Sequence, residues 1–129
     1  MTIVVDCSIV IDALVAQDGQ AASELLAANR LAAPHLMDAE VVSAVRGLVL
    51  GGHLSRHRGN DALDRYDELP ITRWASAGDL RRRALDLRDN FSAYDAAYVV
   101  LAESLDSPLA TRDLGLARAA ARFVDVLVA

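Results

Sequence analysis

The chain of 129 residues contains no lysine, so arginine supplies every permanently positive side chain. A Walker-type phosphate loop and a Schiff-base active site both require a lysine, and both are therefore excluded. Cysteine is nearly missing as well. Cys7 stands alone, which rules out an internal disulfide and a cysteine zinc cluster. A single thiol suits a reducing compartment.

Long apolar runs are also missing. No run approaches the roughly 18 residues that a membrane span requires. The first apolar segment has no basic region before it and is interrupted by Asp6 and Asp12, unlike a secretory signal peptide. We therefore expect a soluble cytoplasmic protein. The formal net charge is -5, so any contact with nucleic acid must come from local arginines and not from the overall field.

Apolar residues are abundant, at 53% of the chain. The length fits one domain, residues 1–129, with one core. A small monomer can hardly bury that much apolar surface, which favours an oligomer or a permanent partner.

Short apolar runs alternate with longer helical ones, a pattern that predicts an α/β fold with a central parallel sheet flanked by helices. We expect Asp38 and Asp79 to be the N-caps of two of the helices, and Trp74 to lie in the core. The predicted strands are 3–5, 31–33, 71–74, 109–111 and 124–128, and the better defined helices are 8–16, 20–29, 38–50 and 114–122.

Four acidic residues interrupt apolar stretches, each at the end of a predicted strand or near the start of a predicted helix. A carboxylate in such a place needs a partner. Ligands of parallel α/β sheets collect at the carboxyl ends of the strands, where these acids would gather. Oxygen ligands suit Mg²⁺ or Mn²⁺, which would relieve the repulsion between the acids. The four are Asp6, Glu40, Asp95 and Asp113.

Nearby hydroxyl groups could orient these acids. Ser8 and Thr111 each stand two positions from an acid, Asp6 and Asp113 respectively, and are natural supporting groups for a metal site. Asp12 and Glu103 are weaker candidate ligands, because each lies further along the helix from Asp6 or Asp95.

Each acid also has a purely structural explanation. Asp95 forms a capping-box pattern with Ser92, Asp113 is suited to be an N-cap, and Glu40 would be favoured by the helix dipole. Asp6 is the hardest to explain in this way, because it directly follows a buried apolar strand. All four explanations would have to hold together by coincidence.

Four segments, in this order and spacing, resemble the PIN-domain ribonucleases and, among them, VapC-type toxins of bacterial toxin–antitoxin pairs. The resemblance covers essentially the whole chain and implies a PIN-like fold. The segments are Ile3-Val4-Val5-Asp6-Cys7-Ser8, the surroundings of Glu40, Ser92-Ala93-Tyr94-Asp95-Ala96-Ala97-Tyr98, and Pro108-Leu109-Ala110-Thr111-Arg112-Asp113.

The resemblance implies an endoribonuclease that depends on Mg²⁺ or Mn²⁺. The four acids match the family's acidic quartet as catalytic and metal-binding residues, with Ser8 and Thr111 beside them. Metal-activated water would attack an RNA phosphodiester and leave a 5′-phosphate and a 3′-hydroxyl. Arg112 is the arginine expected to contact substrate phosphate, and Arg46 and residues 81–83 are further candidates. Cys7 is expected to be a filler and not a nucleophile.

The resemblance also implies a cognate VapB-type antitoxin, a toxin homodimer and a toxin–antitoxin hetero-oligomer. The first helix and the apolar face formed by Val41, Val42, Val45 and Leu48 would form the antitoxin groove.

Three other classes of protein are alternatives, because they also place acidic residues at the ends of strands. A haloacid-dehalogenase-like phosphoryl transferase needs a second acid two residues after Asp6, where this chain has Ser8. A receiver domain needs a lysine, which is lacking. A catalytically silent PIN-like scaffold that binds RNA or protein stays open, although the intact quartet argues against it.

Overall fold

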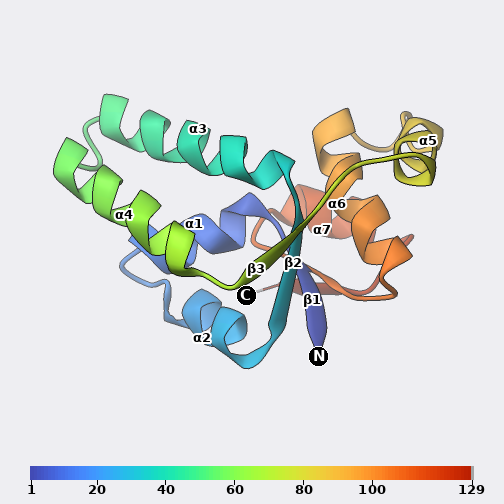
Figure 1. Ribbon diagram of the computed structural model, residues 1–129, viewed down its shortest axis with the longest axis horizontal. Coiled ribbons are helices and arrows are strands. Elements are labelled where there is room, and N and C mark those ends of the chain that lie inside the picture. The colour runs from blue at the N-terminus through green and yellow to red at the C-terminus, as the bar shows by residue number, and fades with distance from the viewer. Residues whose placement is uncertain (129) are drawn as a thin grey trace.

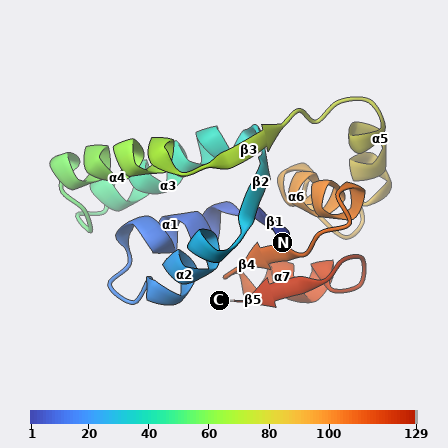
Figure 2. The same cartoon turned by 60° about the horizontal axis from the view of Figure 1, so that its bottom comes forward.

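The computed structural model describes residues 1–128, in which five parallel strands form one sheet between two layers of helices (Figure 1). The strand order is β3-β2-β1-β4-β5, which can be followed in Figure 2. Every strand pair is parallel, so the predicted α/β class is confirmed. The strands are β1 (Thr2–Val5), β2 (Arg30–Pro34), β3 (Ile71–Trp74), β4 (Leu109–Thr111) and β5 (Val126–Val128).

The helices divide between the two faces of the sheet in chain order. Those before β3 lie on one side and those after it on the other (Figures 1 and 2). The first group is α1 (Cys7–Val15), α2 (Gln20–Ala28), α3 (Leu36–Leu50) and α4 (Arg56–Glu68). The second group is α5 (Asp79–Asp86), α6 (Ala93–Ser104) and α7 (Leu114–Ala120).

The central strand β1 is apolar because helices cover it on both faces. Ile3, Val4 and Val5 are all fully buried, as expected for a strand inside a parallel sheet. The chain runs from β1 outwards to β2 and β3, then crosses back to β4 on the other side of β1. Such a reversal leaves a crevice at the carboxyl ends of the two strands, where the loops lead in opposite directions.

Two predicted N-caps are wrong. α3 begins at Leu36, before Asp38, whose carboxylate accepts hydrogen bonds from Tyr66 and Arg73 instead. α5 begins at Asp79 itself, and Gly78 is its N-cap with a φ of 55°. In both cases an acid in the first helical turn still complements the helix dipole, and this effect alone cannot identify the first residue of a helix.

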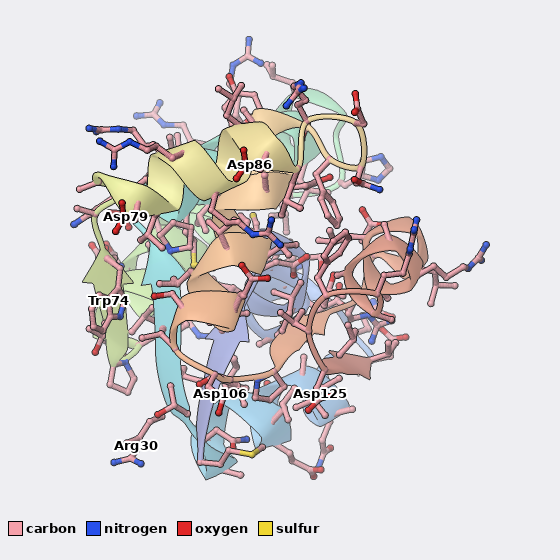
Figure 3. All side chains as sticks on the ribbon, turned by 90° about the vertical axis from the view of Figure 1, so that its right-hand side faces the viewer. Arg30, Trp74, Asp79, Asp86, Asp106 and Asp125 are labelled. Atoms are coloured by element: carbon pink, nitrogen blue, oxygen red, sulfur yellow. The ribbon has the colours of Figure 1, made fainter. Side chains whose placement is uncertain are left out.

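Trp74 is not in the core, contrary to the prediction, since 42% of it is exposed. Its strand β3 pairs only with β2 and lies at the open edge of the sheet. Figure 3 shows Trp74 at this edge of the sheet, on the side of α5 where Asp79 lies. Within residues 1–128, no helix has both the length and the apolar character needed to cross a membrane.

Candidate active site

Asp6 lies at the carboxyl end of β1 and is the most deeply buried acid of the quartet, with 6% of its surface exposed. Its carboxylate accepts hydrogen bonds from the Ser8 hydroxyl at 2.6 Å, the Ile9 amide at 3.3 Å and the Thr111 hydroxyl at 2.5 Å. Asp6 is therefore the N-cap of α1 as well as a buried acid. These donors fix the orientation of both carboxylate oxygens.

The two hydroxyls that hold Asp6 also hold the turn between β4 and α7. The Ser8 hydroxyl accepts the Arg112 amide at 2.9 Å, and the Thr111 hydroxyl accepts the Asp113 amide at 3.0 Å. Each hydroxyl thus donates to Asp6 and accepts from the neighbouring turn. The arrangement fixes the backbone of Asp113 relative to Asp6, although the two residues come from opposite ends of the chain.

Glu40, in the second turn of α3, is partly buried and has one hydrogen-bond donor. The Tyr98 hydroxyl, from α6, donates to its Oε1 atom at 2.5 Å. No other hydrogen bond to the Glu40 carboxylate is found within residues 1–128, and Oε2 is not enclosed by the protein. One oxygen of Glu40 is therefore held by a hydrogen bond, and the other is not.

Asp95 and Asp113 lie near the starts of α6 and α7. The Ser92 hydroxyl caps α6 by accepting the Asp95 amide at 3.1 Å. The Asp95 carboxylate completes no capping box, because no hydrogen bond to it is found in the described part of the chain. Asp113 does act as an N-cap, since its Oδ1 accepts the Leu116 amide at 3.0 Å.

The quartet members are close enough to disturb one another electrostatically. Burial raises the pKa of Asp6 despite its hydrogen-bond donors. Burial, and then the charges of Asp95 and Asp6, raise the pKa of Glu40 despite its bond to Tyr98. Partial burial and the charge of Asp113 raise the pKa of Asp95. Burial is the largest cause at all three carboxyl groups, and the charges of neighbouring acids add to it at Glu40 and Asp95.

The donor set fits a hard divalent cation in kind, since it consists of carboxylate and hydroxyl oxygens. Among residues 1–128, however, no group of three or more acidic, histidine or cysteine side chains is close enough together to hold a metal ion. The acids therefore share one edge of the sheet and one electrostatic field without forming a closed cage. Burial and the charges of Glu40 and Asp6 raise the pKa of the Cys7 thiol to about 12, so Cys7 is not a ready nucleophile.

The other predicted site residues lie around the quartet. The Arg112 guanidinium contacts the Asp12 carboxylate on α1, so the two are an ion pair. Glu103 is bound by Arg83 through two hydrogen bonds of 2.8 and 3.2 Å, which engage both carboxylate oxygens. Arg46 is exposed and lies six residues after Glu40, roughly 240° further around α3. Of these residues, only Arg112 adjoins the quartet directly in sequence.

Sequence reasoning missed Tyr98 and the partnership of Asp12 with Arg112. Tyr98 stands in the apolar helix α6 and is 2% exposed, so by composition it reads as core. The available signal was its spacing, three residues after Asp95, which places both on one side of α6. No comparable signal linked Asp12 with Arg112, because their contact depends on how β4 and α1 come together.

A shallow groove lies between α3 and α4, on a different side of α3 from Glu40. It has a volume of about 220 Å³ and its lining includes Val42, Leu50 and Leu63 with Arg46 and Arg56. Val42 and Leu50 are 52% and 70% exposed, whereas Val41 belongs to the core and Val45, although buried, also lines the groove. The apolar face predicted on α3 is thus divided between a buried side and an open one.

Comparison with known proteins places this architecture in one family. The model of the PIN domain matches residues 3–122. The chain is 45% identical to Ribonuclease VapC9 of Mycobacterium tuberculosis over 87 residues. This alignment covers 67% of this chain and 68% of that protein.

Two solved structures share the fold. FitAcB from Neisseria gonorrhoeae superposes with a TM-score of 0.74 at 18% identity, over 97% of this chain and 96% of that one. VapBC-5 of Mycobacterium tuberculosis, a member of the VapBC family of toxin–antitoxin systems, gives a TM-score of 0.63 at 20% identity, over 98% and 96% of the two chains.

Proposed function

The chain belongs to the PIN-domain family, and on that premise we propose that it is a metal-dependent endoribonuclease and the toxin of a toxin–antitoxin pair. Its 45% identity to a protein named Ribonuclease VapC9 supports the ribonuclease activity. The likeness to a VapBC toxin–antitoxin structure supports a VapB-type antitoxin as partner. The protein would act in the cytoplasm, with RNA as its substrate.

The observation that carries the proposal is the shared electrostatic field of Asp6, Glu40 and Asp95. Burial raises the pKa of all three, and the charges of quartet members raise the pKa of Glu40 and Asp95 further. The chain has no lysine, and Arg112 is already paired with Asp12. A cation from solution is therefore the natural counter-charge for the quartet.

In this proposal Asp6, Glu40, Asp95 and Asp113 hold Mg²⁺ or Mn²⁺. A bound divalent ion supplies the positive charge that lowers the pKa of a water molecule and stabilises charge on the phosphodiester oxygens. Ser8 and Thr111 hold the Asp6 carboxylate in place, and catalysis rests mainly on positioning and on charge stabilisation.

Arg112 and Arg46 are the proposed contacts for RNA phosphate. The contact with Asp12 is made by Nε of Arg112, which leaves the N–H groups at the end of the guanidinium for a phosphate. Arg46 lines the groove between α3 and α4, so it would meet RNA only where the strand passes beyond the quartet.

The antitoxin would bind the groove between α3 and α4, which offers exposed apolar side chains with arginines beside them. Of the groove expected from the sequence, Val42 and Val45 line it, whereas Leu48 and the first helix α1 are not part of its lining in the described chain. A homodimer, and a larger assembly with the antitoxin, would bury further apolar surface of a chain that is 53% hydrophobic.

The test is cleavage of end-labelled structured and unstructured RNAs by the purified chain in Mg²⁺, in Mn²⁺ and in EDTA. Asp95→Asn is the informative variant, because within residues 1–128 the Asp95 carboxylate makes no hydrogen bond that the substitution would break. We expect cleavage that requires the metal and falls by at least about 100-fold in the variant, the size of loss typical for a removed catalytic group.

Asp89→Asn is the matched control, since Asp89 is exposed and lies outside the quartet. It should cleave as the wild type does. Cleavage by Asp95→Asn at the wild-type rate would refute the assignment of the quartet. RNA binding without cleavage under any metal would instead favour a silent PIN-like scaffold.

A further inference from the structure

Tyr98 connects the two helical layers at the edge of the sheet where the quartet lies. Its ring is 2% exposed and belongs to the core, while its hydroxyl donates to Glu40 Oε1 at 2.5 Å. From this geometry we propose that Tyr98 is a positioning residue, which fixes the Glu40 carboxylate for cation binding. The inference rests on the proposed function, because it assumes that Glu40 is a ligand.

Core packing makes the Tyr98 hydroxyl a fixed point. A tyrosine ring enclosed on all sides cannot change its rotamer freely, so its hydroxyl stays in one place. Glu40, by contrast, is a flexible side chain whose only recorded donor within residues 1–128 is this hydroxyl. Holding Oε1 removes most of the rotational freedom of the carboxylate and leaves Oε2, which is not enclosed by the protein, as the free ligand atom.

The position of Tyr98 on α6 links two proposed ligands to one rigid element. Tyr98 follows Asp95 by three residues, so the two side chains lie on the same side of the helix. α6 thus carries Asp95 directly and holds Glu40 of α3 through the Tyr98 hydroxyl. The N-terminal part of α3 and α6 meet at this end of the sheet in Figures 1 and 2.

The chain contains a second tyrosine–carboxylate pair that provides a control. Tyr66 is 4% exposed, and its hydroxyl donates at 2.6 Å to Asp38, which stands two residues before Glu40 on α3. Arg73 also binds Asp38 and lies over the Tyr66 ring at 5.1 Å. The Arg73 guanidinium thus supplies the positive charge beside this pair. Neither Tyr66 nor Asp38 makes a hydrogen bond to the quartet in the described chain.

The experiment measures the dissociation constant of Mn²⁺ for the full chain by electron paramagnetic resonance of the free ion. The variants are Tyr98→Phe, Tyr66→Phe and Tyr94→Phe. Tyr94 serves as an exposed control, since 64% of it is exposed in the wild type. Tyr98→Phe should weaken Mn²⁺ binding by about 10-fold or more, the usual effect of losing a group that orients a ligand. The two controls should stay within about 2-fold of the wild type.

Thermal unfolding separates positioning from general stability. Tyr98→Phe and Tyr66→Phe each remove a buried hydroxyl from a carboxylate, so both should lower Tm, yet only the first should weaken Mn²⁺ binding. If Tyr98→Phe does not fold, Tyr98→Met removes the same hydroxyl with a side chain that adapts to its surroundings. Equal loss of Mn²⁺ affinity in Tyr98→Phe and Tyr66→Phe would overturn the inference.

A double-mutant cycle with Glu40→Gln tests whether Tyr98 acts through Glu40. In the Glu40→Gln background, Tyr98→Phe should change Mn²⁺ affinity by less than about 2-fold. Equal effects of Tyr98→Phe in both backgrounds would refute the inference.

The failure of this inference can be told apart from failure of the proposed function. A wild-type chain that binds no Mn²⁺ and cleaves no RNA refutes both. A wild-type chain that binds Mn²⁺ and cleaves RNA, with Tyr98→Phe unchanged in affinity and in kcat, refutes only the role of Tyr98.

Discussion

Arg112 forms an ion pair with Asp12 on α1. It lies in the β4–α7 turn, between the proposed site residues Thr111 and Asp113. Oδ2 of Asp12 is buried and makes no hydrogen bond of ordinary geometry in the described chain, so its attraction to the guanidinium is mainly electrostatic. Ser8 lies one turn before Asp12 on α1 and accepts the Arg112 amide. α1 therefore holds Arg112 at two points, by its backbone and by its side chain.

Removal of Asp12 should loosen this turn. Asp12→Ala leaves the guanidinium, which is 32% exposed, without its counter-ion. We expect a loss of about 1 to 2 kcal/mol in the free energy of unfolding, below the cost for a fully buried pair. Denaturant titration measures it, with Asp18→Ala, an exposed acid in the following loop, as control. If the loss in the double variant Asp12→Ala/Arg112→Ala equals the sum of the losses in Asp12→Ala and Arg112→Ala, the two residues are not coupled.

Because the pKa of Asp95 is raised in the folded protein, the stability of the fold should depend on pH. A folded-state pKa above the unfolded value means that the folded protein binds the proton more tightly. Its stabilising contribution is complete below about pH 4 and is lost as pH rises through the folded pKa. In EDTA, Asp95→Asn should therefore match the wild-type Tm near pH 4 and exceed it at pH 7.5. An excess that is largest at low pH would contradict the sign of this shift.

Divalent cations should stabilise the wild-type chain at neutral pH. Binding to the folded state alone contributes about 2.7 kcal/mol when the free ion is at 100 times its Kd. Differential scanning calorimetry at pH 7.5 should show Tm rising with Mg²⁺ in the wild type and much less in Asp95→Asn. The increase should disappear near pH 4, where protonated carboxyls no longer bind the ion. Equal increases in both proteins would show that the ion binds elsewhere.

Ser92 and Asp95 separate a structural role from a catalytic one. Ser92→Ala removes the N-cap of α6 and should cost about 1 kcal/mol of stability. Because it leaves the Asp95 carboxylate in place, RNA cleavage at a temperature well below Tm should stay within about 2-fold of the wild type. Asp95→Asn should instead lower RNA cleavage without loss of the N-cap. Equal losses of kcat in the two variants would mean that Asp95 acts only through the helix terminus.

The groove between α3 and α4 can be tested without disturbing the core. Leu50 is 70% exposed, so Leu50→Asp should fold and cleave RNA as the wild type does. A charge in an apolar contact should weaken binding of the cognate antitoxin by at least about 10-fold, or 1.4 kcal/mol. Isothermal titration calorimetry measures it, with exposed Leu85 of α5 substituted by Asp as the control. Unchanged affinity of Leu50→Asp together with a loss for Leu85→Asp would move the binding surface to α5.

The sequence was informative wherever a local rule determines the structure. The apolar run of β1 predicted a strand buried on both faces, and Ile3, Val4 and Val5 are indeed fully buried. The capping-box pattern of Ser92 and Asp95 indicated a helix start, and Ser92 is indeed the N-cap of α6. Local rules failed at Asp38 and Asp79, because an acid in the first helical turn and an acid at the N-cap have nearly the same sequence signal.

By itself the sequence determined the order of strands and helices, the parallel α/β class and the family, since these depend on periodicity and on motifs within short segments. Only the tertiary structure decided which partners the side chains found. It left Trp74 exposed by making β3 an edge strand, paired Arg112 with Asp12, and brought Tyr98 to Glu40. Contacts between distant segments follow from how helices pack across a sheet, which no local pattern encodes.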